Sequence, residues 1–158
     1  MSLNLNPNYV SSHWASVEAG AARSGRTVSR RDWRMVREVF VADTDEEARR
    51  WSVGDMMGRM YGEYFLPLLT AFGFSQYLKA DPDDDDNVTV EYCAEHNWLV
   101  GSPETVAREL ETVYNSVGGF GHLLLFCFDY ADNPEPWRRS MELLAHEVMP
   151  RVAHLTGE

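Results

Sequence analysis

The stretch NWLVGSPETVARELETV, residues 97–113, constrains the fold of this chain more than any other feature. Its short apolar run ends at Gly101. The residues Ser102, Pro103 and Glu104 then supply a helix N-cap, a proline for the first turn and a charge that suits the helix dipole. A strand followed at once by a helix is the repeating unit of a parallel α/β sheet. Because such a unit is not stable alone, further strands must lie elsewhere in the sequence.

Two other segments have the composition of strands. Residues 36–41 are rich in valine and phenylalanine, and the acidic capping box at 44–47 predicts a helix directly after them. Residues 122–130, HLLLFCFDY, form a continuous apolar run of the kind found in strands buried on both faces. We therefore expect an α/β fold with three parallel strands.

Helical periodicity surrounds these strands. Residues 7–24 are expected to form one helix that ends at Gly25, because their apolar residues recur on a single stripe. A final helix has its apolar positions in register from Trp137 to Val152, and Pro150 is expected to lie near its end. Four or more helices thus accompany the three strands.

Residues 54–96 are expected to be an inserted helical and acidic region. Gly54, Gly58 and Gly62 recur every four residues, which fits either close approach of another helix, such as an oligomer contact, or a broken helix. The acidic stretch 79–92 lacks the ligand spacing of a calcium loop, and we expect it to be a mobile, solvated connection.

Composition excludes several classes of partner. The formal net charge of −11 opposes binding to nucleic acid or to an anionic membrane surface. There is no apolar stretch long enough to span a membrane and no pattern of a secretory signal, so we expect a cytoplasmic protein. Cys93 and Cys127 lie in apolar surroundings and are expected to be buried free thiols.

Three segments together resemble the carboxy-terminal part of the bacterial luciferase-like flavin-dependent monooxygenases, in particular the limonene monooxygenase-like branch. They are WRMVREVFVADTDEEARR (33–50), WLVGSPETVARELETVYNSVGGFGHLLLF (98–126) and RRSMELLAHEVMPRV (138–152). The resemblance covers residues 9–154. It implies that residues 1–158 form a single domain corresponding to the last strands and helices of a (β/α)8 TIM barrel.

The same resemblance implies reduced FMN as the cofactor and oxygenation of a small organic substrate. A complete barrel needs about 250 residues, so this chain predicts only a partial barrel, which is expected to be inactive alone and need not bind flavin. The family's catalytic residues lie in the missing part, and we assign no catalytic residue here. The alternative function is a non-catalytic, self-associating α/β module derived from that fold.

A partial barrel leaves one sheet face bare and two strand edges unpaired. A chain carrying the amino-terminal barrel strands, a second copy of this chain, or the glycine-marked helical region folding back could each cover them. Of these, we favour a homodimer.

Candidate cofactor-binding residues lie at the carboxyl ends of the predicted strands, where ligands bind in α/β folds. Gly101 and Ser102 precede a helix N-terminus that could receive a flavin phosphate, although the favoured interpretation of Ser102 is an ordinary N-cap. Asp129 is the best polar candidate after the last strand, although capping of the following turn is its favoured role. Arg37 and Glu38 are adjacent in the first strand and should point to opposite faces, so one charge faces the would-be barrel interior. The histidines have no metal-ligand spacing.

Overall fold

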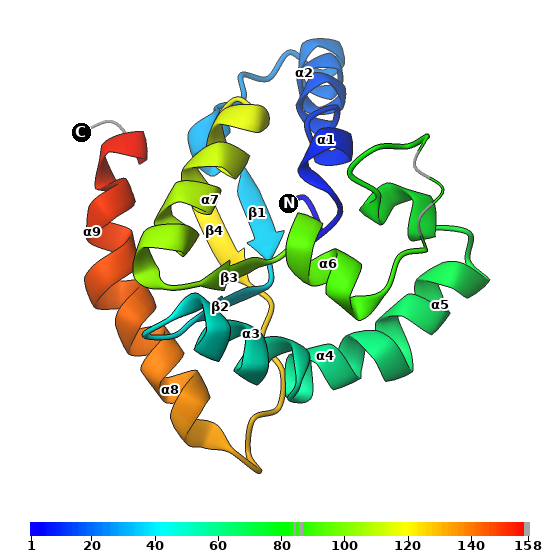
Figure 1. Cartoon of the computed structure of the whole chain (residues 1–158). Helices are drawn as coiled ribbons and strands as arrows, with labels where there is room; N and C mark the ends of the chain where they lie inside the picture. The colour runs from blue at the N-terminus through cyan, green and yellow to red at the C-terminus, as the bar shows by residue number, and fades with distance from the viewer. Residues whose placement is uncertain (84, 86, 157–158) are drawn as a thin grey trace.

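The computed structural model describes residues 1–83, 85 and 87–156 (Figure 1). The strands are β1 Arg34–Arg37, β2 Val39–Val41, β3 Leu99–Gly101 and β4 His122–Leu125. The α-helices are α1 Pro7–Val10, α2 His13–Ser24, α3 Asp45–Val53, α4 Met56–Met60, α5 Leu66–Ala71, α6 Val90–His96, α7 Pro103–Ser116, α8 Pro134–Leu143 and α9 Met149–Val152. Two π-helical turns, Tyr61–Phe65 and Leu144–Val148, join α4 to α5 and α8 to α9. The α/β class predicted from the sequence is correct.

All the strand pairs are parallel, and the segment formed by β1 and β2 is central. β1 pairs with β4, in the register Met35 to Leu123, whereas β2 pairs with β3. Backbone groups of a strand point alternately to its two edges. The Trp33 and Arg37 carbonyls accept from β4 and its continuation, whereas the Glu38 carbonyl accepts from Leu99. β3 and β4 therefore flank opposite edges of the same strand.

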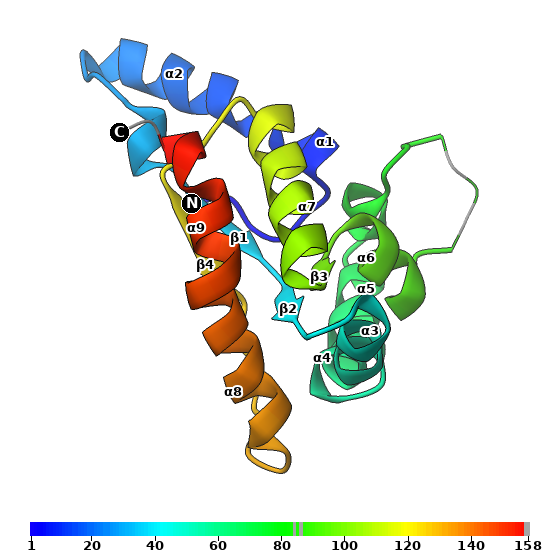
Figure 2. The ribbon, with the colours of Figure 1, turned by 60° about the vertical axis from the view of Figure 1, so that its left-hand side comes forward.

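The central strand separates two hydrophobic cores. The first core lies between one face of the strands and α2, α7, α8 and α9, and it includes Val39, Val41 and Val106. The second core includes Phe40, Met57 and Tyr61 and lies under the helical region from α3 to α6. Figure 2 shows that α3 to α6 group on one side, away from α8 and α9. The helical region with the recurring glycines thus covers part of the sheet face that was predicted to be bare.

The predicted helix caps are present. The Thr44 hydroxyl accepts from the Glu47 amide at the start of α3, and the Ser102 hydroxyl accepts from the Thr105 amide at the start of α7. Gly25 ends α2 with a φ of 66°, in the left-handed region that favours glycine. These local signals positioned the helices correctly because each acts within a few residues.

One helix prediction needs correction. The single helix predicted over 7–24 is divided into α1 and α2 at Ser11 and Ser12. The final helix continues from α8 through the π-helical turn 144–148 into α9 and ends at Val152, so Pro150 lies near its end, as predicted. Proline lacks an amide proton and crowds the preceding turn, and the wider π-helical turn immediately before α9 accommodates this change.

The glycine stripe belongs to a broken helix. α3 ends at Gly54, and Asp55 caps a new helix, α4. Gly58 lies so close to the end of α3 that an added Cβ atom would be 1.8 Å from the Val53 carbonyl oxygen. The glycine at 58 is therefore required by contact between consecutive helices of the same chain.

The last strand is less buried than its sequence indicates. Leu123, Leu124 and Leu125 are only half-buried, so the prediction of a strand covered on both faces is wrong. Both cysteines are free, but Cys127 is exposed and only Cys93 is buried. The predicted mobile acidic connection includes residues 84 and 86, which lie outside the described residues. Within the described part, no helix has the length and apolar character to cross a membrane.

We expect Gly58→Ala to destabilise the chain by about 1–3 kcal/mol, because the added methyl group overpacks the contact between α3 and α4. Gly20→Ala is the matched control. Gly20 lies inside α2 with nothing within 4 Å of an added Cβ atom, so alanine should stabilise the helix by up to about 1 kcal/mol. Urea denaturation of both variants measures the difference. Equal stability of Gly58→Ala and the unmodified chain would contradict the close contact.

Candidate functional site

A buried polar cluster lies between β1 and β2. It consists of Asn4, Glu38 and Tyr61, and we call it the Glu38 cluster. Glu38 Oε1 accepts hydrogen bonds from the Tyr61 hydroxyl and from Asn4 Nδ2, and Asn4 Nδ2 also lies 2.7 Å from the Tyr61 oxygen. The Glu38 side chain is completely buried and Tyr61 is 1% exposed. Three distant segments, the amino terminus, the central strand and the π-helical turn 61–65, therefore meet at one carboxyl group.

Burial controls the charge of this cluster. It raises the pKa of Glu38 above the usual value, and the hydrogen bonds from Tyr61 and Asn4 and the charge of Arg37 only oppose the shift. Burial and the nearby Glu38 also raise the pKa of Tyr61 well above its usual value, so its hydroxyl remains a donor. Glu38 Oε2 is buried without a hydrogen-bond partner in the described part of the chain. Both donors therefore converge on Oε1, and no described residue compensates the burial of Oε2.

Arg37 is a second buried charge. Its Nη1 donates to the Leu5 carbonyl at 2.8 Å, whereas Nε and Nη2 are buried with no partner among the described residues. Burial lowers the pKa of Arg37 to about 10, so the guanidinium stays charged at neutral pH. Arg37 is aligned with Leu125, which packs against the first core, and Glu38 bonds to Tyr61 of the second core. The two side chains therefore occupy opposite faces, as the sequence predicted.

Aromatic side chains line the same face as Glu38. We call Phe65, Phe126 and Phe128 the aromatic wall. The Phe65 ring lies 5.2 Å from Phe126 and 6.5 Å from Phe128, and Tyr61 lies 6.5 Å from Phe128. All three phenylalanines are half-buried. The face thus combines a partly open apolar surface with a buried carboxyl group whose pKa is raised by burial.

The predicted residues Gly101 and Ser102 lie at the carboxyl end of β3, where α7 begins. The Ser102 amide donates to Asp45 Oδ1 at 2.6 Å, and the Thr105 hydroxyl donates to Asp45 Oδ2 at 3.1 Å. These contacts, the Ser102 amide first, hold the pKa of Asp45 below its usual value. A bound anion at the start of α7 would need the Ser102 amide. The Asp45 carboxylate from α3 already accepts a hydrogen bond from that amide. The role of Gly101 and Ser102 as flavin contacts stays a prediction.

The third predicted residue, Asp129, is exposed. Its Oδ1 accepts from the Ala131 amide at 3.0 Å, so the carboxylate caps the turn after β4. β4 and β3 flank opposite edges of the central strand, and no hydrogen bond joins Asp129 to Ser102 among the described residues. Gly101 and Ser102, which are consecutive, lie at the end of β3, and no hydrogen bond among the described residues joins Asp129 to them.

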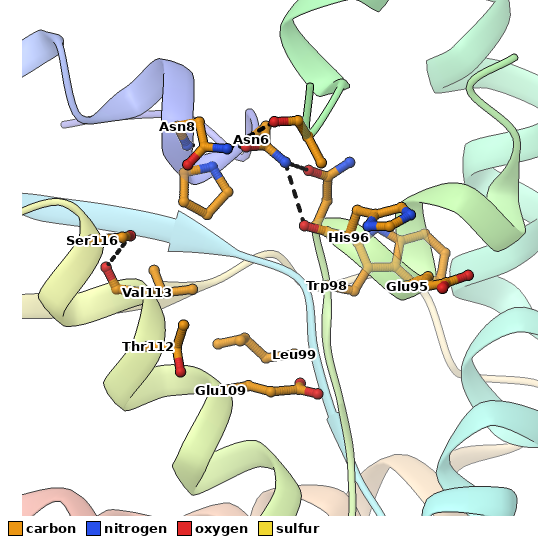
Figure 3. A pocket seen from close by; sticks show the side chains of 13 residues that line it. Asn6, Asn8, Glu95, His96, Trp98, Leu99, Glu109, Thr112, Val113 and Ser116 are labelled. Carbon is orange, nitrogen blue, oxygen red and sulfur yellow. Dashed lines mark hydrogen bonds between the residues drawn. The ribbon is translucent and has the colours of Figure 1, made fainter. Parts of the chain in front are cut away.

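A groove of about 290 Å³ lies at the amino end of β3, between the start of α1 and the carboxy-terminal half of α7 (Figure 3). Asn6 Nδ2 donates to Asn97 Oδ1 at 2.9 Å on one side of it. Glu109 from α7 lies on the other side, and burial raises the pKa of its carboxyl to about 6. Ligands of α/β folds bind at the carboxyl ends of strands, so this groove lies at the opposite end from the expected site.

Sequence reasoning identified a charge facing the interior at Arg37 or Glu38 but missed its partners. Tyr61 lies between Gly58 and Gly62 in the region with recurring glycines, and Asn4 lies near the amino terminus. Neither position has a periodicity or motif that signals a hydrogen bond to Glu38. Only the tertiary structure brings them together.

Comparisons with known proteins find monooxygenases that are similar to this chain. 2,5-Diketocamphane 1,2-monooxygenase 1 of Pseudomonas putida is 35% identical over 144 residues, which are 89% of this chain and 40% of that protein. Limonene 1,2-monooxygenase of Rhodococcus erythropolis is 32% identical over 150 residues, 92% of this chain and 34% of that protein. The chain thus spans less than half the length of the curated relatives it matches. No protein-family model matches it.

One solved structure is similar over nearly the whole chain. It is the oxygenating constituent of 3,6-diketocamphane monooxygenase from Pseudomonas putida, a type II Baeyer–Villiger monooxygenase in complex with FMN. The TM-score is 0.84 at 31% identity, and the match covers 95% of this chain and 42% of that one. The arrangement of strands and helices described above is therefore shared with part of a larger flavin-containing protein.

We expect Glu38→Gln to remove a pH-dependent loss of stability. Since the folded-state pKa of Glu38 lies above the unfolded value of 4.5, the folded chain keeps a proton that the unfolded chain releases, and the free energy of unfolding falls as pH rises above that value. Glutamine keeps an acceptor for Tyr61 and has no proton to lose. The variant should therefore gain stability relative to the unmodified chain between about pH 5 and pH 8, as measured by urea denaturation.

Tyr61→Phe provides the comparison for this experiment. It removes one donor to Glu38 and should lower the free energy of unfolding by about 1–3 kcal/mol even where Glu38 is protonated. Parallel pH profiles for Glu38→Gln and the unmodified chain would show that Glu38 is ionised in the folded state.

Proposed function

We propose that this chain, a homologue of diketocamphane and limonene monooxygenases that spans 34–40% of their length, is the carboxy-terminal part of a luciferase-like, flavin-dependent monooxygenase. The observation that carries the proposal is the similarity, over 95% of the chain, to part of an oxygenating protein in complex with FMN. The three sequence segments quoted above support the same family.

The residues on the second face fit one part of a flavin. The three phenylalanines of the aromatic wall are half-buried, and their rings offer an apolar surface. Phe65, Phe126 and Phe128 would therefore pack against a planar ring system and exclude water from it. Bound reduced flavin would activate oxygen for transfer to the organic substrate. Glu38 would hold a proton close to this face without adding a negative charge to it.

The fit to the flavin phosphate is conditional. Gly101 and Ser102 offer a helix N-terminus, but the Ser102 amide donates to Asp45. A phosphate would bind there only if the Asp45 carboxylate turned away, because two anions at one amide repel each other. We therefore propose the aromatic wall as the primary flavin contact of this chain and keep Ser102 as a secondary one.

The chain alone is proposed to be inactive. A (β/α)8 barrel needs about 250 residues, and the described sheet consists of short parallel pairs with a half-buried last strand. The remaining strands would come from a separate chain or from a longer form of the same polypeptide.

The alternative is a non-catalytic module that associates with a second copy. Exposed aromatic side chains near the end of α5 favour it: Phe72 is 66% exposed and Phe74 is 47% exposed, and their rings are stacked. Such a patch could be buried in a homodimer.

FMN titration of the purified chain, with its mass in solution recorded throughout, tests these proposals. We expect the chain alone to bind FMN weakly and to lack oxygenation of bicyclic ketones or limonene with reduced FMN and oxygen. Addition of the unmatched part of the Pseudomonas putida 3,6-diketocamphane protein, made separately, should produce saturable FMN binding. A stable dimer that never binds FMN, with or without that part, would favour the non-catalytic module.

A further inference from the structure

We propose that the amino ends of β1 and β4 carry a two-part binding site for an amphipathic organic anion. A basic groove takes the anionic head group, and a neighbouring apolar groove takes the hydrocarbon body. The site precedes the first residues of the two strands, Arg34 and His122. The flavin contacts proposed above lie on the second sheet face and at the carboxyl end of β3, so this inference goes beyond the proposed function and does not rest on it.

Basic residues of this acidic chain are concentrated in one segment. Residues 23–34 contain five arginines and one acid, although the formal net charge of the chain is −11. Arg23, Arg26 and Arg34 are exposed and form no ion pair with a described acidic residue. Elsewhere in the chain, ion pairs such as that between Arg139 and Asp43 neutralise the arginines. The segment therefore produces a local positive potential that attracts anions.

A groove of about 340 Å³ lies beside this segment, and we call it the basic groove. It is lined by Arg30, Arg31, the end of α7 and the glycine-rich turn 118–121. The Arg30 guanidinium lies 4.8 Å from the centroid of the Trp14 ring, and its Nη1 donates to the Val117 carbonyl at 2.6 Å. Its Nε and Nη2 form no hydrogen bond with a described residue. A cation that is already held in position thus lines the groove and keeps unused donors for an anionic oxygen.

The glycine-rich turn brings the main chain close to the same cation. Gly118 and Gly119 have φ angles of 76° and 91°, in the region that favours glycine. A Cβ atom added at Gly118 would lie 3.2 Å from atoms of the Arg30 guanidinium, so the turn packs directly against it. The Phe120 amide, in the same turn, donates to no described residue. The basic groove therefore combines arginine side chains with an unpaired main-chain donor.

A second groove, of about 230 Å³, adjoins the first, and we call it the apolar groove. It lies between the start of β4 and the neighbouring helices α7 and α9 (Figure 1). Tyr114, Phe120 and Gly121 line both grooves, which makes the two adjacent. The Tyr114 hydroxyl already donates to the Leu155 carbonyl at 2.7 Å. The other side chains that line the apolar groove are Leu110, Leu123, Met149, Val152, Ala153 and Leu155.

The two grooves together define the chemistry of the ligand. Arginine donors fit a carboxylate or a phosphate, whereas the second groove offers only hydrocarbon surface. A small molecule with one anionic group and an apolar body uses both. An anionic membrane would also offer this chemistry, but the net charge of −11 opposes approach to such a surface. We therefore commit to a free amphipathic anion, for which octanoate is the simplest probe.

Calorimetric titration of the full chain tests the inference. Octanoate should bind at one site per chain, and its affinity should fall as the salt concentration rises, because the head group binds through charge. Two matched probes carry one part of the ligand each: 1-octanol has the body without the charge, and inorganic phosphate has the charge without the body. Each should bind at least roughly tenfold more weakly than octanoate, because it uses only one groove.

Variants locate the site on the molecule. Arg31→Gln should weaken octanoate binding by roughly tenfold, since it removes a charge that lines the basic groove. Arg34→Gln is the matched control: it removes an equally exposed charge of the same segment that does not line the groove, and should change the affinity by less than about twofold. Met149→Gln places a polar group in the apolar groove and should also weaken binding. Urea denaturation checks that all three variants are folded.

The remaining outcomes each overturn the inference. Equal affinity for 1-octanol and octanoate would show an apolar groove without a head-group site, and equal affinity for phosphate would show an unselective anion contact. Displacement of octanoate by FMN would make the site part of the flavin contact. Cosedimentation of the chain with vesicles of anionic phospholipid, without binding of free octanoate, would assign the basic segment to a membrane. Octanoate binding that FMN does not displace supports the site, whether or not the chain forms part of a monooxygenase.

Discussion

Burial of residues 35–41 on both faces is the constraint from which the other contacts follow. Val39 and Val41 belong to the first core and Phe40 to the second, so the strand has no solvent-facing side. Glu38 nevertheless places a carboxyl group in that strand, and a buried acid is tolerated only if it is hydrogen-bonded and its charge is suppressed. Tyr61 supplies a bond from the π-helical turn. The bond therefore fixes the helical region on the second face of the sheet.

The same arrangement makes the molecule asymmetric. Helices of this chain cover the first face, Ser2 and β3 lie along one edge of the central strand, and α4 to α6 cover part of the second face. The aromatic wall and the outer edge of β4 remain partly uncovered, and they are adjacent. Under the proposed function, the remaining strands of a larger monooxygenase would lie on this side.

The carboxyl end of β3 illustrates how one local signal serves two purposes. The residues Gly101 and Ser102 have the features of an anion-binding helix start, and the same features are those of an ordinary N-cap. Asp45 decides between them in this structure, because its carboxylate takes the Ser102 amide and joins the starts of α3 and α7. The acidic first turn of α3, which the sequence predicts to stabilise its own helix, thus also contacts the start of α7.

The sequence by itself determined the α/β class, the strand at 36–41 and the caps at Thr44 and Ser102, because these depend on residues a few positions apart. It also carried the family resemblance, because three segments match as a set. The tertiary structure alone decided that the central strand lies between β3 and β4, and that Asn4, Glu38 and Tyr61 share hydrogen bonds. It also decided that β4 is half-exposed, although its composition is that of a strand buried on both faces. Composition records which residues can be buried, whereas the neighbouring segments present in the fold determine which of them are.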